Sequence, residues 1–205
     1  MSEDWCERWL QGRIGWHEPS GNASLRKYWQ ASGKRVLVPL CGKSVDMLWL
    51  EAEGNDVTGV ELSAIAASAF FEENAIPYTI REGDLPAYVA DTRRITIYCG
   101  DFFDLGERGF DACYDRGALV TLSRDVRPAY VEHIKYLLTP DAYKLIVTVE
   151  YDDEIATGPP FSISEDEFFA YWPELEQVDH YDDIDNGPPK FRDAGLSEMF
   201  ESVWR

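Results

Sequence analysis

Several residues suited to binding a ligand lie where the predicted strands end. A buried strand, RVLVPL, runs into a turn that contains a single glycine, Gly42, and Glu61 ends the next strand about 20 positions later. Because the carboxyl ends of parallel strands share one edge of a sheet, an acid in this place can accept hydrogen bonds from both hydroxyls of a ribose. Gly42 lets the backbone come close to such a ligand. The pattern favours a ribose-containing ligand, and the alternative is an ordinary acid at a strand end.

The turn after the first strand argues against a dinucleotide. A dinucleotide-binding turn reads G-x-G-x-x-G, because a pyrophosphate needs room and converging N–H groups at the start of the helix. This turn instead reads Pro39, Leu40, Cys41, Gly42. A ligand with a ribose but no phosphate does not need the missing glycines, and S-adenosylmethionine fits that description. We predict that backbone groups near Leu40 and Gly42 hold its amino-acid end.

Two further strand exits carry charged side chains at the same expected edge. The segment CGDFF places Asp101 and Phe102 where an acid can meet the adenine amino group and an aromatic ring can cover the base. The alternative is a turn acid followed by core aromatics. The segment YDRGAL adds Asp115 and Arg116, and this arginine can lie over a ligand carboxylate or beside the substrate. A surface ion pair is the simpler fate of Arg116.

Three tryptophans precede the first strand. Trp5 and Trp9 are four positions apart in a predicted helix that begins at the capping residue Ser2, so they share one face. Trp16 follows in a loop marked by glycine and proline. Such spacing is typical of core residues. The alternative is an amino-terminal flap over a cofactor, since an aromatic face attracts a sulfonium cation by roughly 0.5–2 kcal/mol. The loop GPPFS, stiffened by its two prolines, presents Phe161.

Several kinds of catalytic site are missing from the sequence. It shows no activated serine, no cysteine–histidine pair and no carboxylate pair at hydrolase spacing. His17, His133 and His180 are scattered without metal-ligand spacing, so no metal is predicted. Methyl transfer from a sulfonium chiefly needs alignment and a dry site rather than a special nucleophile. The absence of such groups is therefore compatible with a methyltransferase.

The composition excludes other classes of protein. The chain has 205 residues, 45% of them hydrophobic, which suffices for one sizeable core and favours one domain. Its 38 acidic and 19 basic side chains give a net charge of -19, so we predict neither a nucleic-acid nor a membrane partner. Four cysteines without a C-x-x-C pair indicate reduced thiols. With no signal peptide and no apolar run of ~18–20 residues, the predicted location is cytoplasmic.

Predicted strands and helices alternate along the chain. Strands are predicted over 35–40, 56–62, 95–103 with its outgoing loop, 110–117 and 143–152, and two more candidates over 176–184 and 196–205. Helices are predicted over 2–12, 24–33, 43–54, 63–75, 127–138 and 165–172, and residues 77–94 are expected to form an insertion such as a hairpin. This alternation favours an α/β fold whose parallel sheet is covered by helices on both faces.

The same segments resemble a known family. EDWCERWLQGRIGWHE, VLVPLCGKSVDMLWL, VTGVELS, CGDFF, YDRGALV, GPPFSIS and KFRDAGL together look like the thiopurine S-methyltransferases of the bacterial type, in the right order over nearly the whole chain. The resemblance implies a class I S-adenosylmethionine-dependent methyltransferase fold, with a Rossmann-like sheet of seven mostly parallel strands. It also implies methylation of aromatic thiols and thiopurines, and of selenium or tellurium species in some bacterial members. Residues 1–34 would be a lid region on the core, 35–205, of a single domain.

The resemblance also suggests roles for individual residues. Trp9 and Leu40 would cover the cofactor, Glu61 would hold its ribose, and Asp101 and Phe102 would flank adenine. Arg116 would lie at the boundary between cofactor and acceptor as the candidate catalytic residue. The acceptor pocket would be lined by Trp16, Pro160 and Phe161, with Lys190 and Arg192 as further contacts. The chain departs from the family pattern at Trp16, where many relatives carry phenylalanine, and in a short segment before the first strand.

Two rival functions stay open from the sequence. A halide or thiocyanate methyltransferase shares the fold and a similar cofactor turn. A cofactor-binding module without catalysis is the rival from outside the enzymes. The family resemblance implies a monomer with a small-molecule acceptor.

Overall fold

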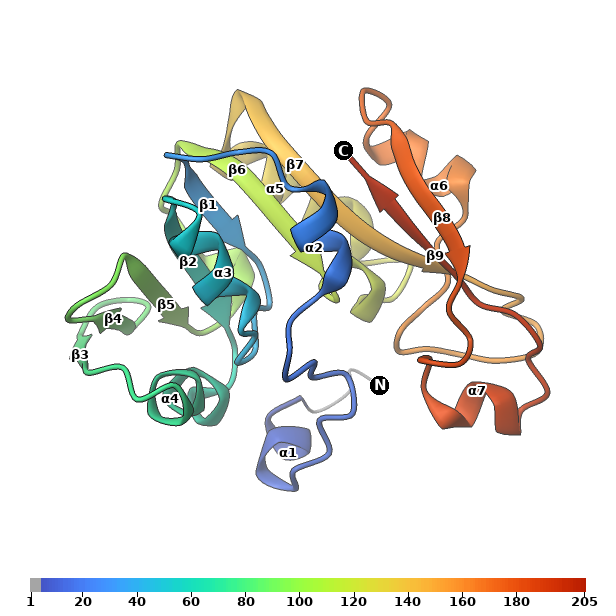
Figure 1. The fold of residues 1–205 in the computed structure, drawn as a ribbon, viewed down its shortest axis with the longest axis horizontal. Coiled ribbons are helices and arrows are strands. Elements are labelled where there is room, and N and C mark those ends of the chain that lie inside the picture. The colour runs from blue at the N-terminus through green and yellow to red at the C-terminus, as the bar shows by residue number, and fades with distance from the viewer. Residues whose placement is uncertain (1–4) are drawn as a thin grey trace.

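The sheet that carries the predicted site is built from most of the chain. The computed structural model describes residues 5–205, and across them the chain forms a nine-stranded sheet in the order β3-β4-β5-β2-β1-β6-β7-β9-β8 (Figure 1). The predicted cap Ser2 lies outside the described residues. The strands are Arg35–Val38 (β1), Asp56–Glu61 (β2), Tyr78–Arg81 (β3), Ala87–Ala90 (β4), Ile95–Cys99 (β5), Phe110–Arg116 (β6), Leu138–Glu150 (β7), Gln177–Asp182 (β8) and Phe200–Trp204 (β9).

The centre of the sheet is parallel and both edges are antiparallel. The neighbours β5-β2-β1-β6-β7 pair in parallel, which confirms the predicted parallel core. On one side β9 lies antiparallel between β7 and β8, which completes the seven expected strands. On the other side the insertion over 77–94 is a hairpin, and its second strand, β4, pairs antiparallel with β5. The hairpin therefore adds two strands beyond the expected seven.

Helices cover both faces, as predicted. They are Trp5–Leu10 (α1), Ala23–Tyr28 (α2), Asp46–Ala52 (α3), Ala64–Glu73 (α4), Arg127–Leu137 (α5), Glu165–Tyr171 (α6) and Pro189–Asp193 (α7), with short 3₁₀ helices Phe102–Asp104 (η1) and Leu119–Thr121 (η2). Side chains alternate along a strand, so Val36 and Val38 of β1 pack in one core with α2, α3 and α4. Leu37 packs in a second core with α5 and α6.

The turn after β1 begins earlier than predicted. The strand was expected to reach Leu40, but β1 ends at Val38. Pro39 has no N–H to donate, and Leu40 has a φ of 46°, in the left-handed region that a non-glycine residue rarely adopts. Gly42 follows with a φ of 54°. The helix α3 consequently starts at Asp46 rather than at residue 43.

The carboxyl ends of the parallel strands face α1 and the loops of the carboxyl-terminal part. Figure 1 shows the arrowheads of β1 and β6 pointing toward the edge at which α1 lies, with α7 at the same edge. The segment between β7 and β9 has its own small core of Tyr151, Ala156, Phe191, Leu196 and Met199. None of the helices found across residues 5–205 has the length and apolar character that a membrane span requires.

Candidate active site

Glu61 ties the first two strand exits together. It ends β2 and is only 6% exposed. Its Oε2 accepts a hydrogen bond from the Gly42 N–H at 2.8 Å, and its Oε1 accepts one from the Ser63 N–H at 2.8 Å. Burial raises the pKa of this carboxyl group, and the N–H donors of Ser63 and Gly42 partly offset that rise. Each oxygen keeps a second lone pair for a further donor such as a hydroxyl.

The helix α1 lies against the turn that contains Gly42. A Cβ atom built on Gly42 would meet Cζ2 of Trp9 at 3.1 Å, so the absent side chain is what lets the indole approach the backbone here. Trp16 packs edge-on against both other rings, with centroid distances of 5.2 Å to Trp5 and 5.9 Å to Trp9. The predicted shared face of Trp5 and Trp9 is thereby confirmed, and Trp9 is buried.

The exit of β5 reaches the same place through its backbone. The Gly100 N–H donates to the Glu61 carbonyl oxygen at 2.9 Å, which sets the start of this loop beside the end of β2. Asp101 is exposed and caps η1 by accepting from the Phe103 N–H at 3.0 Å. Phe102 is buried against Tyr130, whereas Phe103 is 41% exposed. The solvent-exposed ring of this loop is therefore that of Phe103, whereas the prediction named Phe102.

Arg116 is bound to the loop that carries Trp16. Its Nη1 donates to the Trp16 carbonyl oxygen at 3.0 Å, and its Nη2 forms an ion pair with Glu18. The preceding residue, Asp115, points the other way and is buried. Asp115 accepts from Tyr130 Oη at 2.8 Å and from two N–H groups of the following turn, and burial raises its pKa to about 6.

The loop with Pro160 and Phe161 is fastened to the turn after β6. The Phe161 N–H donates to the carbonyl oxygen of Val120 at 2.6 Å, and Val120 belongs to η2. Tyr151 Oη donates to the Pro160 carbonyl oxygen at 2.7 Å. Pro160 and Phe161 are half-buried, and both peptide bonds from Gly158 to Pro160 are cis. The loop is therefore held by Tyr151, which directly follows β7, and by η2.

The two predicted basic contacts on α7 have other partners in the structure. Lys190 Nζ donates to the Thr157 carbonyl oxygen at 3.1 Å, which fastens α7 to the start of the proline loop. Arg192 is exposed and pairs with Asp185 at 3.2 Å. Within residues 5–205, neither Lys190 nor Arg192 forms a hydrogen bond or an ion pair with Arg116 or Trp16.

Three acids near the candidate site were missed by sequence reasoning. Glu18 binds Arg116, Asp46 accepts from the Asn22 N–H at 2.7 Å and from Tyr114 Oη at 2.9 Å, and Glu201 lies buried on β9. Their partners come from distant parts of the chain, so no local pattern marks them. Asp46, in the first turn of α3, reads in sequence as an ordinary helix-start acid.

No metal centre emerges from the described residues, and two of the cysteines are buried. Within residues 5–205 no group of three or more histidine, cysteine and acidic side chains could hold a metal ion. Cys41 and Cys113 are buried, and burial raises the pKa of both thiols well above the usual value.

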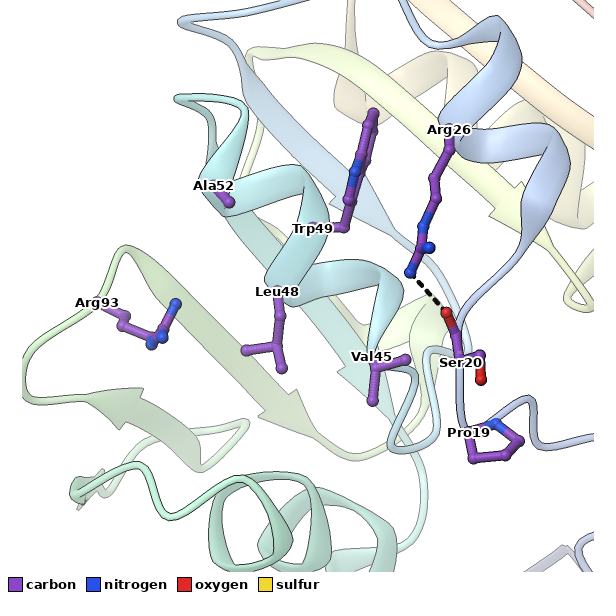
Figure 2. A pocket seen from close by; sticks show the side chains of 8 residues that line it. All are labelled: Pro19, Ser20, Arg26, Val45, Leu48, Trp49, Ala52 and Arg93. Carbon is purple, nitrogen blue, oxygen red and sulfur yellow. Dashed lines mark hydrogen bonds between the residues drawn. The ribbon is translucent and has the colours of Figure 1, made fainter.

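A surface groove of about 640 Å³ lies between α3 and the segment leading into α2. Figure 2 shows its lining, with Arg26 donating to the Ser20 carbonyl oxygen at 2.6 Å. It is lined by Pro19, Ser20, Arg26, Val45, Leu48, Trp49, Ala52 and Arg93. The groove contains none of the predicted site residues, so the strand exits described above remain the candidate site.

Comparison with known proteins identifies the family. The family described as "Thiopurine S-methyltransferase (TPMT)" matches residues 1–205. The chain belongs to the thiopurine S-methyltransferase family. Among its relatives, the thiopurine S-methyltransferase of Bordetella petrii is 41% identical, with 100% of this chain and 97% of that protein covered. That of Pseudomonas putida is 38% identical over 98% of this chain and 96% of its own length.

Solved structures show the fold of this thiopurine S-methyltransferase family member independently. The 1,6-didemethyltoxoflavin-N1-methyltransferase of Burkholderia thailandensis, solved with S-adenosylhomocysteine, superposes with a TM-score of 0.62 at 20% identity, covering 98% of this chain and 85% of that one. A TehB-like S-adenosylmethionine-dependent methyltransferase from Corynebacterium glutamicum gives 0.55 at 18% identity, covering 99% and 96%. The class I methyltransferase fold is confirmed, and the chain is an S-adenosylmethionine-dependent S-methyltransferase.

The residues at the strand exits fit this cofactor. The turn after β1 lacks the cluster of glycines that a pyrophosphate needs. S-adenosylmethionine contains no pyrophosphate, so it does not need that cluster. The Glu61 carboxylate is buried and still has lone pairs for a ribose diol. Trp9 places its indole ring against Gly42, and an aromatic ring of this kind attracts a sulfonium cation.

Proposed function

We propose that the chain transfers the methyl group of S-adenosylmethionine to the sulfur of a small aromatic thiol or thiopurine. The observation that carries this proposal is the direct bond between Arg116 and the backbone of Trp16, at the strand exit beside the Phe161 loop. One cation and two aromatic side chains thus gather at the carboxyl edge of the sheet. A flat, electron-rich sulfur compound is a suitable occupant for such a group.

The proposed cofactor contacts and acceptor contacts are assigned from the strand exits. The proposed cofactor contacts are Glu61, Gly42, Leu40, Asp101 and Phe102, together with Trp9. When bound, S-adenosylmethionine supplies the methyl group: its carbon–sulfur bond breaks as the bond to the acceptor sulfur forms. Trp16, Pro160 and Phe161 position the acceptor and exclude water. Lys190 and Arg192 stay proposed acceptor contacts.

No enzyme base is assigned in this proposal. An aromatic thiol ionises readily near neutral pH, so a tuned histidine or carboxylate is not required to remove its proton. Arg116 supplies positive charge near the acceptor or the cofactor carboxylate. The rate should therefore follow the thiolate fraction of the acceptor as the pH rises.

A labelled methyl-transfer screen tests the proposal. The panel holds thiophenol, a thiopurine, phenol, aniline, selenite, tellurite and iodide. We expect methylation of the sulfur acceptors, with phenol and aniline inactive. Activity on selenium or tellurium species would extend the acceptor class, whereas a volatile product from iodide alone would favour a halide methyltransferase. Cofactor binding without any turnover would indicate a non-catalytic module. The monomeric state and the cytoplasmic location stay predictions.

A further inference from the structure

The cation of the proposed acceptor site already has an anionic partner within the chain. Arg116 Nη2 pairs with the carboxylate of Glu18, two residues after the Trp16 carbonyl that binds Nη1. We propose that Glu18 is a specificity-determining residue, which neutralises Arg116 and disfavours acceptors that carry a permanent anionic group. This inference rests on the proposed function, because it assumes that the acceptor lies beside Arg116 and Trp16.

Glu18 is held in place by its own segment. The Gly21 N–H donates to the Glu18 carbonyl oxygen at 3.1 Å, and Asn22 Nδ2 reaches its Oε2 at 3.4 Å. Asn22 is in turn fastened to buried Asp46 through its N–H at 2.7 Å. The same short segment therefore supplies one wall of the proposed pocket, Trp16, and the counter-charge of its cation.

A second acid, Glu201, lies close enough to Arg116 for their charges to interact. Glu201 lies buried on β9 and binds Tyr181 and Ser24 rather than the arginine. Burial raises the pKa of Glu201, while the hydrogen bond from Tyr181 and the charge of Arg116 lower it, and Asp183 and Glu18 raise it further. An acceptor carboxylate near Arg116 would have to displace Glu18 and face Glu201. An acceptor whose only polar atom is its sulfur has no second anion to place there.

Two acceptors that differ by one carboxylate test this specificity. Thiophenol and 4-mercaptobenzoate share the ring and the thiol, and both are thiolates at about pH 8.5. We expect wild type to favour thiophenol in kcat/KM. In Glu18→Gln the ratio should move toward 4-mercaptobenzoate by about tenfold, mainly through KM, because Arg116 is freed for the carboxylate. Raising NaCl to about 0.5 M should shrink the difference.

Two variants separate charge from structure. Glu132→Gln removes the same charge from an exposed pair with Lys135 on α5, and we expect it to leave the ratio unchanged. Glu18→Asp keeps the charge, so its ratio should stay near that of wild type. An unchanged ratio in Glu18→Gln with normal cofactor affinity would overturn the proposal, as would an equal shift in Glu18→Asp.

Benzoate binding provides an arm that does not need turnover. We expect calorimetry to show tighter benzoate binding to Glu18→Gln than to wild type in the presence of S-adenosylhomocysteine. Equal affinities would overturn the role of Glu18. If wild type methylates neither thiol while Glu18→Gln still binds benzoate more tightly, the proposed function fails and the role of Glu18 at Arg116 stands.

Discussion

Among single residues, Glu61 combines a structural role with a proposed role in cofactor binding. Both oxygens hold backbone N–H groups of neighbouring turns, and both are proposed to receive ribose hydroxyls. A charge-assisted hydrogen bond contributes ~1.5–3 kcal/mol, so Glu61→Gln should weaken cofactor binding by about one to two orders of magnitude. The amide also turns an NH2 group toward a backbone donor, so the Tm should fall. Calorimetry on folded protein checks the affinity, and unchanged binding would refute the ribose role.

Asp115 is a residue whose burial should appear in the pH dependence of stability. Its pKa is raised by burial to about 6, above the ~3.9 of an unfolded chain. Between about pH 4 and 6 the native state therefore keeps a proton on Asp115 that the unfolded state has lost. Protonation of Asp115 contributes its full stabilisation below about pH 4, and this contribution disappears as the pH rises through 6. Relative to Asp115→Asn, wild type should lose about 2–3 kcal/mol between pH 4 and 7.5. Urea unfolding at several pH values measures this, and an equal pH dependence of the unfolding free energy in the two proteins would contradict it.

At the scale of elements, α1 is the part proposed to act as a lid. It is a short helix, and Trp9 and the Trp16 loop connect it to the Gly42 turn and to Arg116. Short terminal segments are loosely held unless something docks them, so bound S-adenosylhomocysteine should slow amide exchange over residues 5–17. Hydrogen-exchange mass spectrometry measures this, with the core strand β7 as the internal reference. Equal exchange with and without ligand would make α1 a fixed part of the core.

At the scale of the whole molecule, the charge of -19 should act on the cofactor as it approaches. S-adenosylmethionine carries a net positive charge through its sulfonium, whereas S-adenosylhomocysteine is neutral overall. Raising the ionic strength from about 10 to 150 mM shortens the screening length from ~30 to ~8 Å. The association rate of S-adenosylmethionine should then fall by roughly tenfold while that of S-adenosylhomocysteine stays nearly constant. Stopped-flow fluorescence of the tryptophans can follow both, and equal salt slopes would rule out steering.

Local sequence patterns were enough to predict the order of the core elements and the acid at the end of β2. The alternation of apolar strands with helices is a local pattern, and each predicted strand of the parallel core is present. Glu61 was also predictable as a strand-end acid, because the strand and its length follow from neighbouring residues. The shared face of Trp5 and Trp9 follows in the same way from helix periodicity.

The contacts that these residues make could not be predicted from local patterns. The pairing of the hairpin with β5, the choice of Phe102 rather than Phe103 for the core, and the partnership of Arg116 with Glu18 all depend on segments far apart in sequence. The left-handed backbone of Leu40 likewise needs the surrounding contacts to hold it. Periodicity and propensity describe one segment at a time. Side-chain partners are set by the packing of several segments at once, and for that reason they became visible only in the folded molecule.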